Sequence, residues 1–105
     1  MNRIEQLEKF IAEDGADLFS RYALALEYMK LENYDEAEKT FQFLAVNHPE
    51  YIATYFQYGK LLMTMSRSEE AKIIFRKGMD ATRNTNQKTY SELQNELTNL
   101  ELGIS

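Results

Sequence analysis

The sequence predicts an all-α protein built from repeated pairs of antiparallel helices, and three observations support this fold class. Apolar residues recur at three- and four-residue steps, whereas no segment alternates with period two for long enough to form a convincing strand. The composition is 44% hydrophobic with only 4 Gly and 1 Pro in 105 residues, which suits a folded chain with short loops. Two segments of 34 residues are similar to one another, which indicates an internal repeat.

The first two predicted helices cover residues 2–13 and 18–31. The first carries a single apolar stripe and is expected to end at Asp14 and Gly15, because glycine tolerates the left-handed backbone that ends helices. Asp17 is expected to cap the second helix. The second helix has too many apolar residues for one stripe, which indicates contact with neighbours on two sides and therefore an array of helices.

The third and fourth helices are predicted at residues 35–47 and 51–65. A tight turn at residues 32–34 leads into the third helix, and the chain leaves the helical pattern before Pro49, because the residue preceding a proline disfavours helical backbone. The fourth helix is rich in aromatic and aliphatic residues along most of its length. Both helices are expected to bury apolar faces against their neighbours.

The fifth and sixth helices are predicted at residues 68–81 and 87–101. Ser68 is expected to cap the fifth helix, ahead of two glutamates that suit the positive end of a helix dipole. The sixth helix has an interrupted apolar stripe in a sequence rich in Gln, Asn, Glu and Thr, before Gly103 ends it. This polarity suits the terminal cap of an array.

The self-similarity appears when residues 18–51 are laid over residues 52–85, an offset of 34. Both copies are predicted to consist of a helix, a short turn and a second helix. The identical pairs are Met29 and Met63, Glu36 and Glu70, Ala37 and Ala71, and Phe41 and Phe75. Small residues in these pairs let helix backbones approach closely, and the phenylalanines fill the layer between them.

This 34-residue unit resembles the tetratricopeptide repeat, on Leu24, Ala25, Tyr28, Tyr34, Asp35, Glu36, Ala37, Phe41 and Pro49 in the first copy and on Tyr55, Gly59, Leu62, Glu69, Glu70, Ala71 and Phe75 in the second. The resemblance implies a short right-handed α-solenoid of about six helices in one domain, residues 1–105. Its expected parts are a partial leading repeat at 1–15, repeats at 18–51 and 52–85, and a capping helix and tail at 86–105. The chain departs from the pattern at Arg21, where the family often has Trp, at Arg83, where it has Pro, and at Leu44 and Gly78, where it has Ala.

The resemblance also implies a concave surface, lined by the first helix of each pair, that binds protein segments. The positions carried over from the family are Phe19, Tyr22, Leu26, Met29 and Lys30 in the second helix, Phe56, Lys60 and Met63 in the fourth, and Tyr90, Gln94 and Leu97 in the sixth. Aromatic and methionine side chains there favour an apolar or amphipathic segment as ligand. Alternatively, the sixth helix folds across this surface and buries the same residues within the protein.

Two functions follow. The first is an adaptor or scaffold that binds another protein or a peptide segment. The second is a self-associating structural module, a homo-oligomer without a groove ligand, because the open end of a repeat stack exposes apolar surface. One family specialisation is not expected: the clamp for the acidic tails of heat-shock chaperones uses Lys and Asn where this chain has Tyr22 and Leu26, which would leave a buried carboxylate unpaired.

Other classes of function find little support in the composition. The net charge of −5 disfavours nucleic acid and anionic membranes as ligands. Residues 67–88 carry a local excess of +3, which is typical of a solvated helix face and could alternatively steer an acidic partner. With no Cys and a single His, His48, in a turn, we expect no catalytic residues, no metal site and no cofactor. The charged amino terminus and the absence of Cys fit a cytoplasmic protein.

Overall fold

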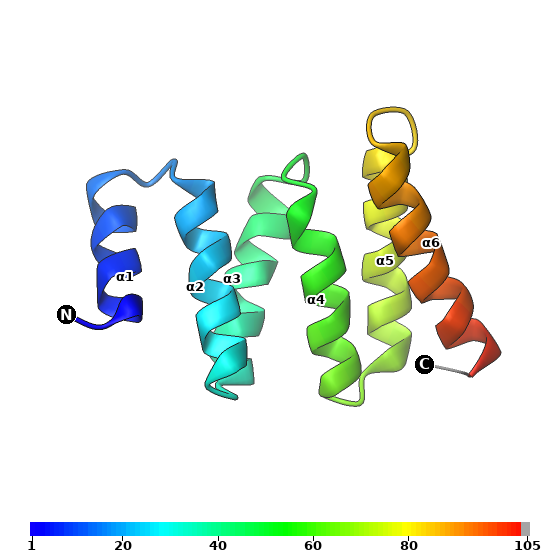
Figure 1. The fold of residues 1–105 in the computed structure, drawn as a ribbon, viewed down its shortest axis with the longest axis horizontal. Helices are drawn as coiled ribbons and strands as arrows, with labels where there is room; N and C mark the ends of the chain where they lie inside the picture. Colours follow the sequence, from blue (N-terminus) through cyan, green and yellow to red (C-terminus); the bar gives the residue numbers. More distant parts are fainter. Residues whose placement is uncertain (104–105) are drawn as a thin grey trace. The chain divides into compact units, whose positions relative to one another are not determined.

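The computed structural model describes residues 1–103, and all regular structure within this range is helical. This range forms six α-helices, and short turns join them (Figure 1). Their bounds are α1 (Arg3–Glu13), α2 (Leu18–Lys30), α3 (Tyr34–Asn47), α4 (Ala53–Thr64), α5 (Ser68–Thr82) and α6 (Gln87–Leu102). The predicted all-α fold of six helices is therefore confirmed. The last two residues of the predicted tail lie outside the described part of the chain.

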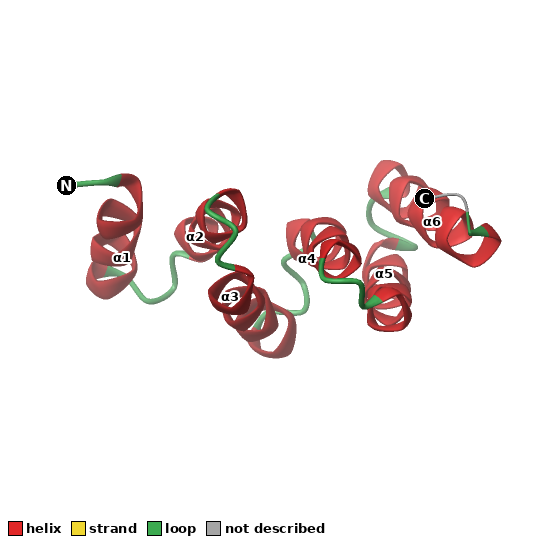
Figure 2. Cartoon of the chain, turned by 90° about the horizontal axis from the view of Figure 1, so that it is seen from below, coloured by secondary structure: helices red, strands yellow, loops and turns green. Residues whose placement is uncertain are grey.

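Contacts divide the chain into two compact units, Met1–Thr54 and the part from Tyr55 onward. In the first unit, α2 packs against both α1 and α3, as the two views agree (Figures 1 and 2). The predicted two-sided contact of this helix is confirmed. Its contact with α1 centres on buried apolar side chains, with partly buried ones packed around them: Leu7, Ala23 and Leu24, and Ile4, Ile11 and Tyr28.

In the second unit, two glycines set how closely the helices approach. A Cβ atom at Gly59 in α4 would lie 2.2 Å from the buried ring of Phe75 in α5. At Gly78 in α5, a Cβ atom would lie 2.6 Å from the Cβ of Tyr55 and 2.7 Å from Cδ1 of Leu93, so α4 and α6 both reach this position. Gly78, which departs from the family's Ala, thus leaves room for two larger neighbouring side chains.

The 34-residue repeat is visible in the backbone of the turns after α2 and α4. Glu32 and Ser66 both have a positive φ, 60° and 61°, and each donates its N–H to the carbonyl three residues before it, at 2.9 and 3.0 Å. The residue that follows each of them donates to a carbonyl five residues back, at 2.8 Å in both turns. These are the two bonds of a Schellman motif, which satisfies carbonyls that the helix end leaves unpaired.

Two of the positions where this chain departs from the family pattern, Arg21 and Arg83, have a structural explanation. The Arg21 guanidinium lies 4.3 Å from the ring centroid of Phe43, and its Nη2 donates to the carbonyl of Gly15 at 3.3 Å, so Arg21 ties the α1–α2 turn to α3. Arg83 follows α5 with helical backbone and donates its N–H to the carbonyl of Met79 at 2.9 Å. A proline at this position could not donate that bond.

Three local predictions about helix ends were wrong. Gly15 does not have left-handed backbone; α1 ends at Asp14 in an extended conformation, and the left-handed glycine is Gly103. Ser68 is the first residue of α5 and not its cap, a position that Arg67 takes without a side-chain capping bond. Residues 51–52 precede α4 instead of starting it.

Asp17 caps α2 as predicted, since its carboxylate accepts the N–H of Ser20 at 2.9 Å. The handedness of the solenoid and the single-domain organisation stay predictions.

Candidate functional site

The predicted binding residues of α2 lie in the first unit and differ in exposure. Phe19 is 66% exposed, Lys30 is exposed, and Leu26 and Met29 are half-buried. Tyr22 is held between two rings, with centroid separations of 6.3 Å to Phe41 and 5.9 Å to Tyr51. Phe19, Leu26 and Met29 thus remain accessible to a ligand to differing degrees.

The Tyr22 side chain is part of the packing of the first unit. Burial, followed by the nearby Tyr51 hydroxyl, raises the pKa of Tyr22 above its ordinary value of 10.0. The hydroxyl therefore stays protonated at neutral pH. Its ring joins α2 to α3 and to the segment before α4, so Tyr22 contributes to packing whether or not a ligand touches it.

The predicted residues of α4 and α6 lie in the second unit, where Lys60 connects the two helices. Its Nζ is 3.1 Å from Oε1 of Glu96 in α6 and 5.6 Å from the ring centroid of Phe56, one turn earlier in α4. Phe56 and Met63 are both half-buried, so α6 does not cover either completely. This α4/α6 face, defined by Phe56, Lys60, Met63 and Glu96, presents apolar surface beside a paired charge.

Sequence reasoning missed Glu96. An ion pair between two residues that are 36 positions apart leaves no periodic signal, and Glu96 lies on a helix whose many polar residues suit a terminal cap equally well. Of the other α6 residues, Gln94 is exposed, whereas Tyr90 is half-buried with the Arg83 guanidinium 5.8 Å from its ring centroid.

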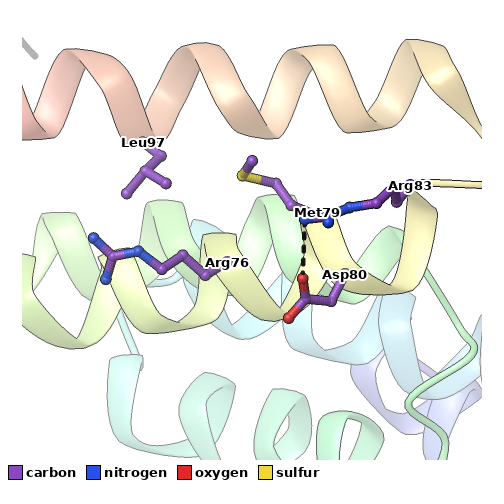
Figure 3. Close-up of a pocket in the computed structure, with 5 residues that line it drawn as sticks. All are labelled: Arg76, Met79, Asp80, Arg83 and Leu97. Carbon is purple, nitrogen blue, oxygen red and sulfur yellow. Dashed lines mark hydrogen bonds and ion pairs between the residues drawn. The ribbon is translucent and has the colours of Figure 1, made fainter.

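A pocket of about 290 Å³ lies between α5 and α6, and it was not predicted as a site. Its lining residues are Arg76, Met79, Asp80, Arg83 and Leu97. In Figure 3, Leu97 points from α6 toward α5, the Met79 side chain points toward α6, and the two arginines lie on either side. The positive excess of residues 67–88 was the one sequence signal in this region. Leu97, carried over from the family as a groove residue, is buried and lines this pocket.

Residues 1–103 contain no group of three or more His, Cys, Asp or Glu side chains arranged to hold a metal ion. His48 ends α3 and places Nδ1 3.6 Å from Oε1 of Glu50. Within the same range, every helix is too short or too polar to traverse a lipid bilayer.

Comparisons with known proteins support the assignment of two 34-residue helical repeats. The sequence model of the tetratricopeptide repeat matches residues 20–42 and 52–85, more than half of the chain. No curated protein matches the sequence. Two solved structures of a tetratricopeptide repeat domain protein from Salinibacter ruber are similar. The solution NMR structure is 35% identical with a TM-score of 0.81, covering 88% of this chain and 93% of that chain.

The crystal structure of the Salinibacter ruber domain is 36% identical with a TM-score of 0.76, covering 85% of this chain and 99% of that chain. A protein from Bordetella parapertussis shares the fold in its solution structure, at 23% identity and a TM-score of 0.82, covering 98% of this chain and 90% of that chain. With its repeated helix pairs and the matched segments together, the chain belongs to the tetratricopeptide repeat family.

Proposed function

We propose that this protein is an adaptor or scaffold that binds an apolar or amphipathic segment of another protein on the α4/α6 face. The tetratricopeptide repeat fold generally serves in protein–protein interaction, which supports the class of function. The observation that carries the site is Lys60, which pairs with Glu96 above the Phe56 ring while Phe56 and Met63 keep exposed area. Aromatic and methionine side chains supply contact area that adapts to a partner, and the ion pair supplies a polar rim.

The α2 residues Phe19, Leu26 and Met29 are proposed as a second contact surface, in the first unit. The exposed Phe19 is the strongest candidate there, because a large aromatic side chain in solvent gains most from burial against a partner. Tyr22 is less suitable for testing, since its ring packs against Phe41 and Tyr51 and its loss would disturb the fold as well as any binding.

A displayed library of random peptides, panned against the protein, tests the α4/α6 face. We expect enriched peptides to be apolar or amphipathic and to lose binding to Phe56→Glu, because the variant lacks the aromatic contact surface and places a carboxylate that an apolar segment would have to desolvate. Ile73→Glu is the matched control, since Ile73 is an apolar residue of the same unit that is 51% exposed on α5, outside this face. Circular dichroism establishes that both variants fold. Enriched peptides that bind Phe56→Glu as well as they bind the wild type would rule out this face.

A second candidate function is self-association as a structural module, and the exposure of Phe10 favours it. Phe10 is 43% exposed, whereas Leu44 and Gly78, which stand 34 and 68 residues further along, are both buried. A position that the repeat otherwise buries is thus an exposed aromatic in α1. Covering a large apolar side chain at such a position with another molecule lowers the free energy, which favours association.

A further inference from the structure

The pocket between α5 and α6 combines an apolar floor with two separated positive charges. Met79 and Leu97 supply the apolar surface, and Arg76 and Arg83 lie on either side of it (Figure 3). Seven residues along a helix place the two arginine backbones roughly 10 Å apart along the axis. An apolar side chain with acidic groups beside it is the chemistry that complements this arrangement.

Both arginines now hold carboxylates of their own chain, and both pairs are solvent-exposed. Arg76 Nη2 is 3.2 Å from Oε2 of Glu101, and Arg83 Nη2 is 3.4 Å from Oδ1 of Asp80. Exposed ion pairs of this kind contribute little to stability, because water screens them and two long side chains must be ordered. An incoming carboxylate can therefore replace Glu101 or Asp80 at small cost.

A side chain of the required chemistry lies at the other end of the same chain. Phe10 is exposed on α1, and Glu13 and Asp14 follow it by three and four residues, on the same side of the helix end. Glu13 is only loosely paired, with its Oε1 4.0 Å from the Nζ of Lys9. Asp14 is exposed, and its Oδ1 accepts the N–H of Ala16 at 3.0 Å, which leaves its other carboxylate oxygen, like the Glu13 carboxylate, to face an arginine of another molecule.

We propose that the protein self-associates head to tail, with Phe10 of one copy seated in the α5/α6 pocket of the next. Glu13 and Asp14 then pair with Arg76 and Arg83, in exchange for Glu101 and Asp80. The charges of the two ends are complementary: residues 1–17 carry five acidic side chains against two basic ones, and residues 67–88 carry six basic against three acidic. This inference rests on self-association, the second candidate function above.

The contact differs from the close helix pairs inside the chain. There, α4 approaches α5 through Gly59, whose backbone lies against the buried ring of Phe75. The proposed junction is instead an aromatic side chain entering a pocket, and it joins two different surfaces. Such a heterologous contact leaves one free end on each side, so copies add in series, as open chains or as rings of several copies, instead of stopping at a two-fold dimer.

Mixing two defective variants tests this geometry. Phe10→Ser lacks the inserted side chain but keeps the pocket, whereas the double variant Arg76→Glu/Arg83→Glu lacks the pocket charges but keeps Phe10. We expect the mass of the wild type, measured by sedimentation, to rise with concentration and to fall with added salt. Each variant alone should remain monomeric, and their equimolar mixture should form a dimer that does not grow further. Ile73→Ser, an exposed apolar residue of α5 outside the pocket, should assemble like the wild type.

The outcomes separate the geometry from the function. A wild type that stays monomeric at every concentration overturns both the inference and self-association as a function. A wild type that assembles, with variants that still assemble alone or a mixture that stays monomeric, overturns only the head-to-tail contact. As a second measurement, Asp80→Asn removes a competing carboxylate and should lower the concentration at which assembly is half complete, by about two- to fivefold. An unchanged or higher midpoint in that variant contradicts the proposed exchange of partners.

Discussion

The backbone of Gly59 lies against the ring of Phe75 so closely that a single added methyl group has no room. An ideal Cβ atom at Gly59 would be 2.2 Å from Cε1, 2.5 Å from Cζ and 2.7 Å from Cδ1 of that ring. The ring itself has no exposed area, so it cannot move aside into solvent. The approach of α4 to α5 therefore depends on this pair of residues.

Gly59→Ala should destabilise the protein by about 1–3 kcal/mol, the range for overpacking a well-packed core. Helix propensity alone predicts the opposite, since Ala in a helix interior is favoured over Gly by about 1 kcal/mol. Urea unfolding followed by circular dichroism measures the change. Gly15→Ala is the matched control, because a Cβ there would meet only Nη2 of Arg21, at 3.9 Å, and should cost little. A Gly59→Ala protein as stable as the wild type would mean that the helices can separate without loss.

The sequence predicted the helices well because the repeat reports on the core directly. Phe41 and Phe75 were paired by the 34-residue offset, and both are fully buried; Leu7, a further 34 residues before Phe41, is buried as well. Residues that recur at one position of each helix pair must meet the same surroundings, so periodicity and burial agree. The prediction of left-handed backbone at Gly15 was wrong, because Asp14 ends α1 in an extended conformation, which needs no left-handed glycine.

The candidate sites were less predictable, because they depend on contacts between helices. The family pattern places Lys60 on a binding surface, but only the structure shows that Lys60 pairs with Glu96. The α5/α6 pocket depends on the direction of Met79 and Leu97, which no local sequence pattern fixes. Arg21 illustrates the same limit: the sequence shows only that it departs from the family's Trp, whereas in the structure its guanidinium lies against the Phe43 ring.

Thr54→Val should stabilise the protein, by about 1 kcal/mol. Thr54 has no exposed area, and its hydroxyl is the one buried side-chain polar atom within residues 1–103 that has no hydrogen-bond partner. Replacing it with a methyl group of the same shape removes the desolvation cost of an unpaired group. Thr82→Val is the control: Thr82 is equally buried, but its Oγ1 donates to the carbonyl of Gly78 at 2.8 Å. Thermal unfolding should move the two midpoints in opposite directions, and equal shifts would contradict this account.

The turns after α2 and α4 predict a second stabilising substitution. Glu32→Gly should raise the free energy of unfolding by about 1 kcal/mol. A residue with a side chain in left-handed backbone costs about 1–2 kcal/mol, and glycine adopts φ near 60° without that cost, although it loses more entropy on folding. Lys30→Gly, two residues earlier at the last residue of α2, should instead destabilise the protein, because its backbone is helical and gains nothing from glycine. The repeat provides an internal replicate, because Ser66→Gly should behave like Glu32→Gly. Opposite signs for Glu32→Gly and Ser66→Gly in chemical unfolding would show that the two turns are not equivalent.

The cap of α2 should make stability depend on pH in the acidic range. Two hydrogen bonds from Ser20, from its Oγ at 2.5 Å and from its N–H at 2.9 Å, hold the pKa of Asp17 below its ordinary value of 3.8. A carboxyl group whose pKa is lower in the folded state binds more protons when unfolded, so its contribution is present above pH 3.8 and is lost as the pH falls through the lowered value.

Asp17→Asn isolates this contribution, because asparagine also caps helices but does not titrate in this range. At pH 7 the wild type should have the higher thermal midpoint, and the difference should shrink as the pH falls from about 4 toward 2. A hydrogen bond from Arg67 also lowers the pKa of Glu70, so the stabilisation from Glu70 is likewise lost as the pH falls, in the wild type and in Asp17→Asn alike. The test is therefore the difference between the two curves of thermal midpoint against pH. Curves that stay parallel down to pH 2 would mean that ionisation of Asp17 does not stabilise the cap, and that the hydrogen bond to the Ser20 N–H, which asparagine also accepts, accounts for it.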